Sequence, residues 1–276
     1  MKTTFKSTLV ENQGTKFLSD ESSIREWLDK YEVKDYTING DFTVSVNGPL
    51  ALDNKGIEEI PVKFSEVNGS IDVTTNRLKR IDWAPAKVNG DFDAWDNEIE
   101  TLVGGPTEVE LSMDVDGNKL TDLHGAPKKV GKCFVVSKNP LKTLAGCPEV
   151  VKGYFKAAEC GLTQLDDLPR EIGTNLYIQD NELKSLKGIN KLLKNLNVTN
   201  SSKGGKINIS KNPIENGLSS CLAIKGFKEF TLDQLSSIGD KSLKPATGII
   251  NSAIAAGEDA FEVQEKLLDS EYANFA

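Results

Sequence analysis

Residues 88–108 read VNGDFDAWDNEIETLVGGPTE, and the following residues 109–129 read VELSMDVDGNKLTDLHGAPKK. The two stretches carry apolar residues, an asparagine and a proline at the same places, so the chain repeats with a period of 21 residues. A fixed period of about 20 to 50 residues is typical of a solenoid, in which similar units stack on one another. The repeat therefore predicts the fold class.

The same pattern recurs in seven successive units, which begin at every twenty-first residue from Val46 to Ile172. Each unit contains apolar residues in alternation, which predicts a short strand with one buried face. An asparagine then follows in most units, and its amide is expected to bond the backbone of its own turn and of the adjacent unit. These asparagines are Asn76, Asn97, Asn118, Asn139 and Asn181.

The spacing of the apolar pair, the asparagine and the later leucines is the leucine-rich-repeat pattern. We therefore expect an α+β leucine-rich-repeat solenoid with units of about 21 residues and one short parallel strand per unit. A solenoid must cover its two exposed ends, so helical caps are expected at the N- and C-terminal ends.

The pattern divides the chain into four parts. Residues 1–18 are a polar N-terminal arm, residues 19–45 an N-terminal cap made of a helix and a strand, and residues 46–228 the solenoid. Residues 229–276 are a helical C-terminal cap or, alternatively, a docking region. Ile24, Trp27, Leu28 and Tyr31 have the spacing of one helix face, which predicts the first helix.

Three helices are expected in the C-terminal part. Thr231 and Gln234 read as a capping box that would begin the first of them. The other two are expected at Pro245–Ala255 and Asp259–Tyr272.

Four of the return segments, 81–88 (IDWAPAKV), 102–109 (LVGGPTEV), 123–130 (LHGAPKKV) and 144–150 (LAGCPEV), carry a further resemblance. They resemble the units of leucine-rich-repeat-like proteins encoded by tailed bacteriophages. The resemblance covers roughly residues 20–220 and ends before the C-terminal helices. It implies a solenoid fold and a phage setting, but no catalytic residue, because the function of that family is mostly uncharacterised.

The net charge of −8 is distributed unevenly. Residues 41–130 hold 17 acids and 9 bases, a charge of −8, whereas residues 131–228 hold 8 acids and 15 bases, a charge of +7. With one histidine and four cysteines that form no CxxC pair, we expect neither a metal site nor a cofactor. The chain has no apolar run long enough for a membrane helix and no signal-like N-terminus, so we expect it in the cytoplasm of an infected bacterial host, or in the virion.

The outward side chains of the predicted strands form the candidate partner-binding surface, expected on the concave face of the solenoid. Its first half is acidic around an exposed tryptophan, and its second half is aromatic and basic. Aspartate is a poor strand former, but these aspartates could also serve only for solubility, or form a ladder that binds a cation. The candidate residues are Asp53, Asp72, Asp91, Asp93, Trp95, Asp114, Asp116, Tyr154, Lys156 and Tyr177.

Exposed aromatic residues among charges are typical of protein interfaces. We therefore expect a phage-encoded, protein-binding solenoid that engages or inhibits a host protein with a basic surface. The alternative is a structural or accessory component of the phage particle. Nucleic acid is disfavoured as a partner because the acidic half would repel phosphates. An enzyme is not expected, because the carboxylates lie on an open surface with no pocket to shift their pKa values. The oligomeric state stays open.

Overall fold

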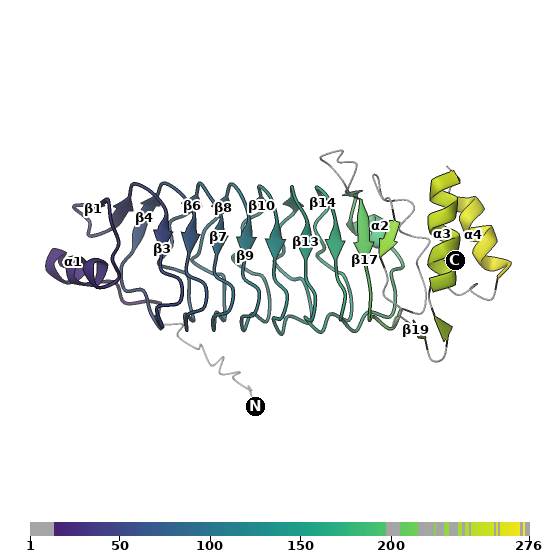
Figure 1. Ribbon diagram of the computed structural model, residues 1–276, viewed down its shortest axis with the longest axis horizontal. Helices are drawn as coiled ribbons and strands as arrows, with labels where there is room; N and C mark the ends of the chain where they lie inside the picture. The colour runs from purple at the N-terminus through teal and green to yellow at the C-terminus, as the bar shows by residue number, and fades with distance from the viewer. Residues whose placement is uncertain are drawn as a thin grey trace, which may run out of the picture.

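The computed structural model describes residues 14–196, 205–214, 224, 229–231, 237–238, 241–242, 244–256, 258, 260–270 and 273. They form an elongated parallel β-solenoid of about seven turns, with few helices (Figure 1). Equivalent residues of successive turns pair with one another 21 residues apart, as Phe92 does with Met113 and Phe134 with Phe155. The predicted period is therefore confirmed by the strand register.

The longer of the two parallel sheets has nine strands and contains the strands that the sequence predicts. We call it the long sheet. Its strands are, in spatial order, β3 (Leu50–Ala51), β5 (Ile71–Asp72), β7 (Phe92–Asp93), β9 (Met113–Asp114), β11 (Phe134–Val135), β13 (Phe155–Lys156), β15 (Leu176–Tyr177), β17 (Lys206–Asn208) and β18 (Glu229–Thr231).

A second parallel sheet of six strands, the short sheet, shows that the expectation of one strand per unit is wrong. The β-branched residue that begins each unit, such as Val88 or Val130, lies in a strand of its own. The sequence pattern hides this strand because it is only two residues long and has a single buried position. Its strands are β6 (Lys87–Val88), β8 (Glu108–Val109), β10 (Lys129–Val130), β12 (Val150–Val151), β14 (Glu171–Ile172) and β16 (Asn195–Leu196).

The core lies between the two sheets and the irregular third side of each turn. In one turn Val88, Phe92, Ala94, Ile99 and Leu102 are all fully buried. Equivalent residues stack on their neighbours: the rings of Phe134 and Phe155 lie 5.9 Å apart and nearly parallel. Each turn therefore completes its core only when another turn lies on each side of it.

The repeated asparagines are buried and bond the backbones of two adjacent turns. The Asn118 amide nitrogen donates to the carbonyls of Val115, in its own turn, and of Ala94, in the preceding turn, at 3.0 and 2.9 Å. Its carbonyl oxygen accepts the backbone N–H of Ile99 at 2.9 Å. Equivalent bonds are made by Asn76, Asn97, Asn139, Asn181 and Asn212.

The N-terminal end of the solenoid carries one helix and one hairpin. Helix α1 (Glu21–Lys30) begins at Asp20, whose carboxylate accepts the N–H of Ser23 at 2.8 Å. Ile24 and Leu28 of this helix are buried in the core. Strand β1 (Tyr36–Ile38) pairs antiparallel with β2 (Val44–Val46), which pairs parallel with β4 (Phe64–Val67).

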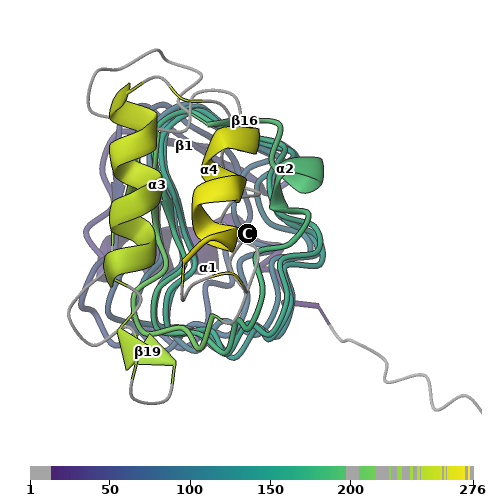
Figure 2. The same ribbon diagram turned by 90° about the vertical axis from the view of Figure 1, so that its right-hand side faces the viewer.

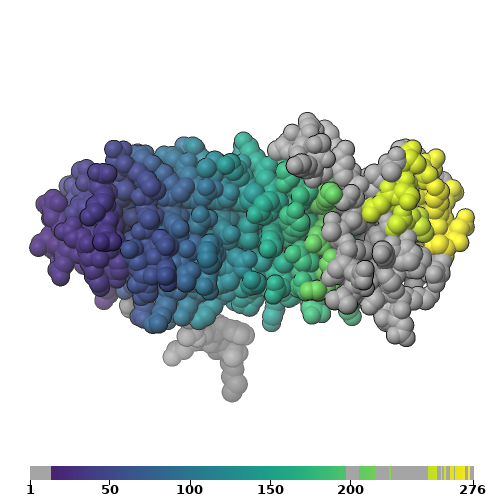
Figure 3. Space-filling model, viewed as in Figure 1, coloured from purple at the N-terminus to yellow at the C-terminus, as the bar shows by residue number. Residues whose placement is uncertain are grey.

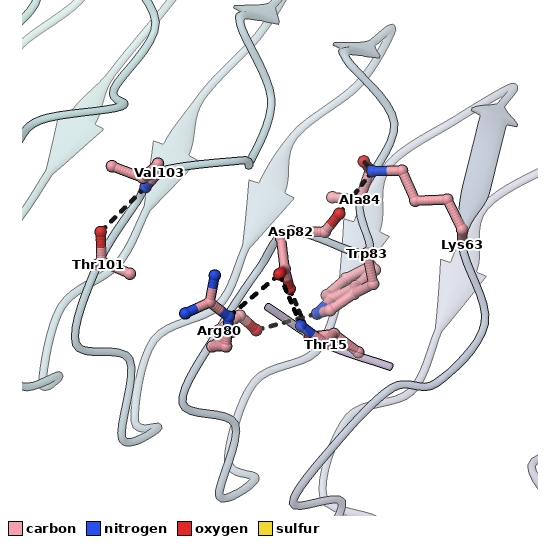
Figure 4. Close-up of polar contacts among 8 residues, drawn as sticks. All are labelled: Thr15, Lys63, Arg80, Asp82, Trp83, Ala84, Thr101 and Val103. Atoms are coloured by element: carbon pink, nitrogen blue, oxygen red, sulfur yellow. Dashed lines mark hydrogen bonds and ion pairs between the residues drawn. The ribbon is translucent and has the colours of Figure 1, made fainter. Parts of the chain in front are cut away.

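Residues 14–18 of the predicted arm lie against the solenoid, whereas residues 1–13 lie outside the described part of the chain. The Asp82 carboxylate accepts the backbone N–H and the hydroxyl of Thr15 at 3.1 and 2.6 Å (Figure 4). It also accepts the Arg80 guanidinium at 3.1 Å. Burial alone would raise the pKa of Asp82, but these bonds outweigh it and lower the pKa.

At the C-terminal end, two of the three predicted helices are present. Helices α3 (Lys244–Ala256) and α4 (Ala260–Leu268) lie side by side beyond the last turns (Figures 1 and 2), and a short helix α2 (Ile189–Leu192) precedes β16. Among the described residues, no helix is both long and apolar enough to cross a membrane.

The first predicted C-terminal helix is wrong where the structure describes the chain. Thr231 ends β18, and β19 (Ser237–Ile238) pairs antiparallel with β20 (Lys241–Ser242); residues 232–236 lie outside the described part. β18 pairs with β17 and so extends the long sheet up to Thr231, and Ser237 and Ile238 lie in an antiparallel pair where the helix was expected.

We expect Asn118→Ala to lower the free energy of unfolding by about 3 kcal/mol, because the backbone groups it bonds are buried and lose their partners. Equilibrium denaturation in urea measures this change. The control is Lys55→Ala, since Lys55 occupies the same position of the first unit but is exposed; it should cost less than about 0.5 kcal/mol. Equal losses in the two variants would contradict a structural role for the asparagines.

Candidate partner-binding surface

The central outward column of the long sheet brings the predicted aspartates together. Asp72 pairs with Asp93 and Asp93 with Asp114 in the strand register, so their side chains leave neighbouring strands about 4.8 Å apart. All three are partly exposed, whereas their strand neighbours Ile71 and Phe92 are fully buried. The column continues through Val135, Lys156, Tyr177 and Asn208.

The carboxylates of the three aspartates differ in their hydrogen-bond partners. The Asp72 carboxylate accepts the N–H and hydroxyl of Thr74 at 3.0 and 2.8 Å, and the Asp114 carboxylate accepts the N–H of Asp116 at 3.0 Å. Within the described part of the chain, no hydrogen bond or ion pair reaches the Asp93 carboxylate. Burial, with the negative charges of Asp91, Asp114 and Asp72, raises the pKa of Asp93 to about 6. Asp93 therefore lacks the positive charge that would stabilise its ionised form.

Trp95 lies beside this column with 43% of its surface exposed. It borders a hollow of about 440 Å³. The hollow exists because Gly117 has no side chain, whereas the equivalent position of the adjacent turns holds Asp96 or Lys138. The lining residues are Trp95, Asp96, Asp114, Asp116, Gly117 and Lys138. Three carboxylates, the Lys138 ammonium group and an indole ring thus share one recess.

The second half of the surface is aromatic and basic, as predicted. The rings of Tyr154 and Tyr177 meet edge to face with centroids 5.6 Å apart. Lys156 pairs with Tyr177 across the strands. The Tyr177 hydroxyl accepts the amide of Asn175 at 3.0 Å, which leaves its O–H free to donate. The charge of the surface therefore reverses along the solenoid axis.

The ten predicted residues follow the long sheet, but they do not form one compact cluster. Asp53 is exposed on the turn of β3, and Asp91 accepts the N–H of Ser112 at 2.8 Å. The sequence prediction missed Asp96 and Lys138, which stand just beyond the outward columns with positive φ values of 57° and 53°. Figures 1 and 3 show the turns following one another along a single long axis, so the long sheet presents one extended outward surface along the solenoid. The expectation that this surface is concave stays a prediction.

A cation site is not supported by the described residues. Neighbouring outward aspartates leave the sheet side by side, about 4.8 Å apart, and no group of three or more histidine, cysteine, aspartate or glutamate side chains among the described residues could hold a metal ion. Burial raises the pKa of Cys160 to about 12, so this thiol stays protonated and is a poor metal ligand.

Comparison with known proteins adds no relative. No protein-family model matches the chain, and neither the curated proteins nor the solved structures contain a match. The geometry and charge of the surface therefore carry the functional argument.

We expect Asp93→Asn to stabilise the protein at pH 7.5 by about 1 kcal/mol, a value reduced for solvent screening because the side chain is partly exposed. Since folding raises the pKa of Asp93, its contribution to stability is full below the unfolded-state pKa and is lost as the pH rises through about 6. The gain should therefore vanish near pH 4. Thermal melts at both pH values measure it, with the exposed Asp53→Asn as control; a gain of equal size at both pH values would contradict this origin.

Proposed function

We propose that the chain is a protein-binding solenoid that engages a partner with a basic surface through the outward face of the long sheet. The observation that carries the proposal is the Asp93 carboxylate, which lies between two other aspartates without a positive partner. A lysine or arginine of a bound protein would relieve the repulsion among these three charges.

The exposed Trp95 supports the same surface as the binding site. Large aromatic residues in a recess are frequent anchors of protein interfaces, and an indole ring also attracts the cationic head of lysine or arginine. The recess beside Trp95 holds Asp114 and Asp116, so one basic side chain could contact the ring and a carboxylate together. Nucleic acid fits this half poorly, because its phosphates would meet the same carboxylates.

The proposed setting is a phage-infected bacterium, in which the solenoid occupies or inhibits a host protein. This part of the proposal is supported by the resemblance of the return segments, such as 123–130, to units of phage-encoded proteins. We assign no catalytic step to the chain, because the carboxylates of the long sheet stand on its partly exposed outward face.

Affinity capture tests the proposal with the full chain immobilised and host lysate as the source of partners. The variant Asp72→Asn/Asp93→Asn/Asp114→Asn should reduce the recovery of a specific partner at least about tenfold, because it removes three charges from the surface. Trp95→Ala should weaken binding by a similar factor while the fold is kept, since Trp95 is exposed.

The matched control is Glu100→Gln/Glu108→Gln/Glu149→Gln, which removes three exposed acids outside the long sheet and should leave capture unchanged. Quantitative mass spectrometry of the captured proteins is the readout. Recovery of the same partners by the wild type and the aspartate variant would refute the proposed surface.

A further inference from the structure

We propose that the outward face of the long sheet also binds a second copy of this chain, in a two-fold symmetric dimer whose solenoids run in opposite directions. The proposal rests on the proposed function in one respect, since both assign binding to this face. Its basis is the charge sequence of the central column: three aspartates, then Val135, then Lys156, Tyr177 and Asn208.

The column becomes self-complementary when it is reversed about Val135. Asp114 of one copy then faces Lys156 of the other, because each stands one turn from Val135. Two turns from Val135, Asp93 faces Tyr177. The Tyr177 hydroxyl already accepts a bond from Asn175, so its O–H is available to donate to the unpaired carboxylate. By symmetry each of these contacts occurs twice.

One turn further out, Asp72 faces Asn208 of the second copy. The Asn208 side-chain oxygen accepts the N–H of Ser210 at 3.0 Å, and the amide group can donate through its nitrogen to a facing carboxylate. The two copies keep this match over many turns because their turns have the same spacing of about 4.8 Å. An unrelated flat surface would not share that spacing.

The outward residues two positions before and two positions after the central column are compatible with the same antiparallel arrangement. Asp91 faces Asn175, and Trp95 faces Gln179, so no acidic residue of these columns meets another acidic residue. The alternative two-fold arrangement, with the solenoids parallel, would place Asp93 opposite Asp93 of the second copy. Like charges directly opposite one another are destabilising, so the face favours the antiparallel arrangement.

The size of the face predicts a weak dimer. The eight strands from β3 to β17 span about 34 Å along the axis, and five residues of each turn span about 16 Å. Two copies would thus bury about 1,100 Å² in total, close to the lower limit for specific protein interfaces. We therefore expect association in the micromolar range, weakening as salt screens the charge pairs.

Sedimentation equilibrium of the full chain tests the dimer at concentrations up to about 500 µM, in about 50 and 500 mM salt. Asp114→Lys and Lys156→Glu should each weaken association at least about tenfold, because each opposes two pairs of like charges. The double variant Asp114→Lys/Lys156→Glu restores opposite charges and should associate within about threefold of the wild type. An equimolar mixture of the two single variants should associate as well, since one supplies the charge that the other needs.

The control Lys129→Glu reverses an exposed lysine of the short sheet and should leave association unchanged. Circular dichroism shows which variants fold; the milder Asp114→Asn and Lys156→Gln replace any that do not. A monomeric wild type at low salt overturns the dimer, as do single variants that associate like the wild type or a double variant and mixture that both stay monomeric.

Titration with a lysine-rich peptide of about ten residues, followed by tryptophan fluorescence, separates the dimer from the proposed function. If the chain stays monomeric but the peptide still changes the fluorescence, and Asp93→Asn weakens this response, the dimer proposal is refuted and the proposal of a basic partner is supported. If the charge-reversal variants associate as expected for the dimer but no peptide binds to the monomer, the dimer proposal is supported and the proposal of a basic partner is refuted.

Discussion

The structure depends on one recurring interaction: most turns place an asparagine amide at the same corner, within reach of two backbones. The Asn139 amide donates to the Val136 and Val115 carbonyls and accepts the Leu120 N–H, so it joins its own turn to the one before. A buried amide with these partners specifies the register, because a shift by one residue would leave its donors and acceptors unpaired. The same bonds recur every 21 residues from Asn76 to Asn139, and they recur at Asn212 across a longer turn after Asn181.

The position of Cys160 shows how far the constraint can be relaxed. Its thiol contacts the Val136 and Ala158 carbonyls at 3.4 and 3.3 Å, but it cannot accept the N–H of Leu141, which bonds the Asn139 carbonyl instead. The turn keeps its place because Asn181 receives the N–H groups of Cys160 and Leu162 from the other side. The solenoid thus tolerates one turn with the weaker thiol contacts of Cys160 between turns that have asparagine hydrogen bonds. This is expected of a solenoid in which each unit contacts only its neighbours.

The period and the outward columns could be predicted from the sequence because they depend on local spacing and recur seven times. The short sheet could not, since a two-residue strand such as Lys87–Val88 leaves no alternation to detect. The β18 strand could not be predicted from the sequence either, because it forms by pairing with β17 and its own residues do not indicate a strand. The hydrogen bond between Thr15 and Asp82 joins residues 67 positions apart, and no local sequence pattern predicts it.

Because the backbone repeats, outward residues at the same step of successive turns lie side by side, and equal charges there repel one another. At Asp93, burial first and then the negative charges of Asp91, Asp114 and Asp72 raise the pKa of the carboxyl. Stability alone does not explain this choice, because a neutral residue at any of the three positions would remove the repulsion without touching the core. The column changes to Lys156 only after Val135, on the same backbone and in the same register. Since the folding constraint acts on the inward residues and the corner asparagine, folding alone does not fix the outward charge order, and we propose that recognition of a surface with matching charges does.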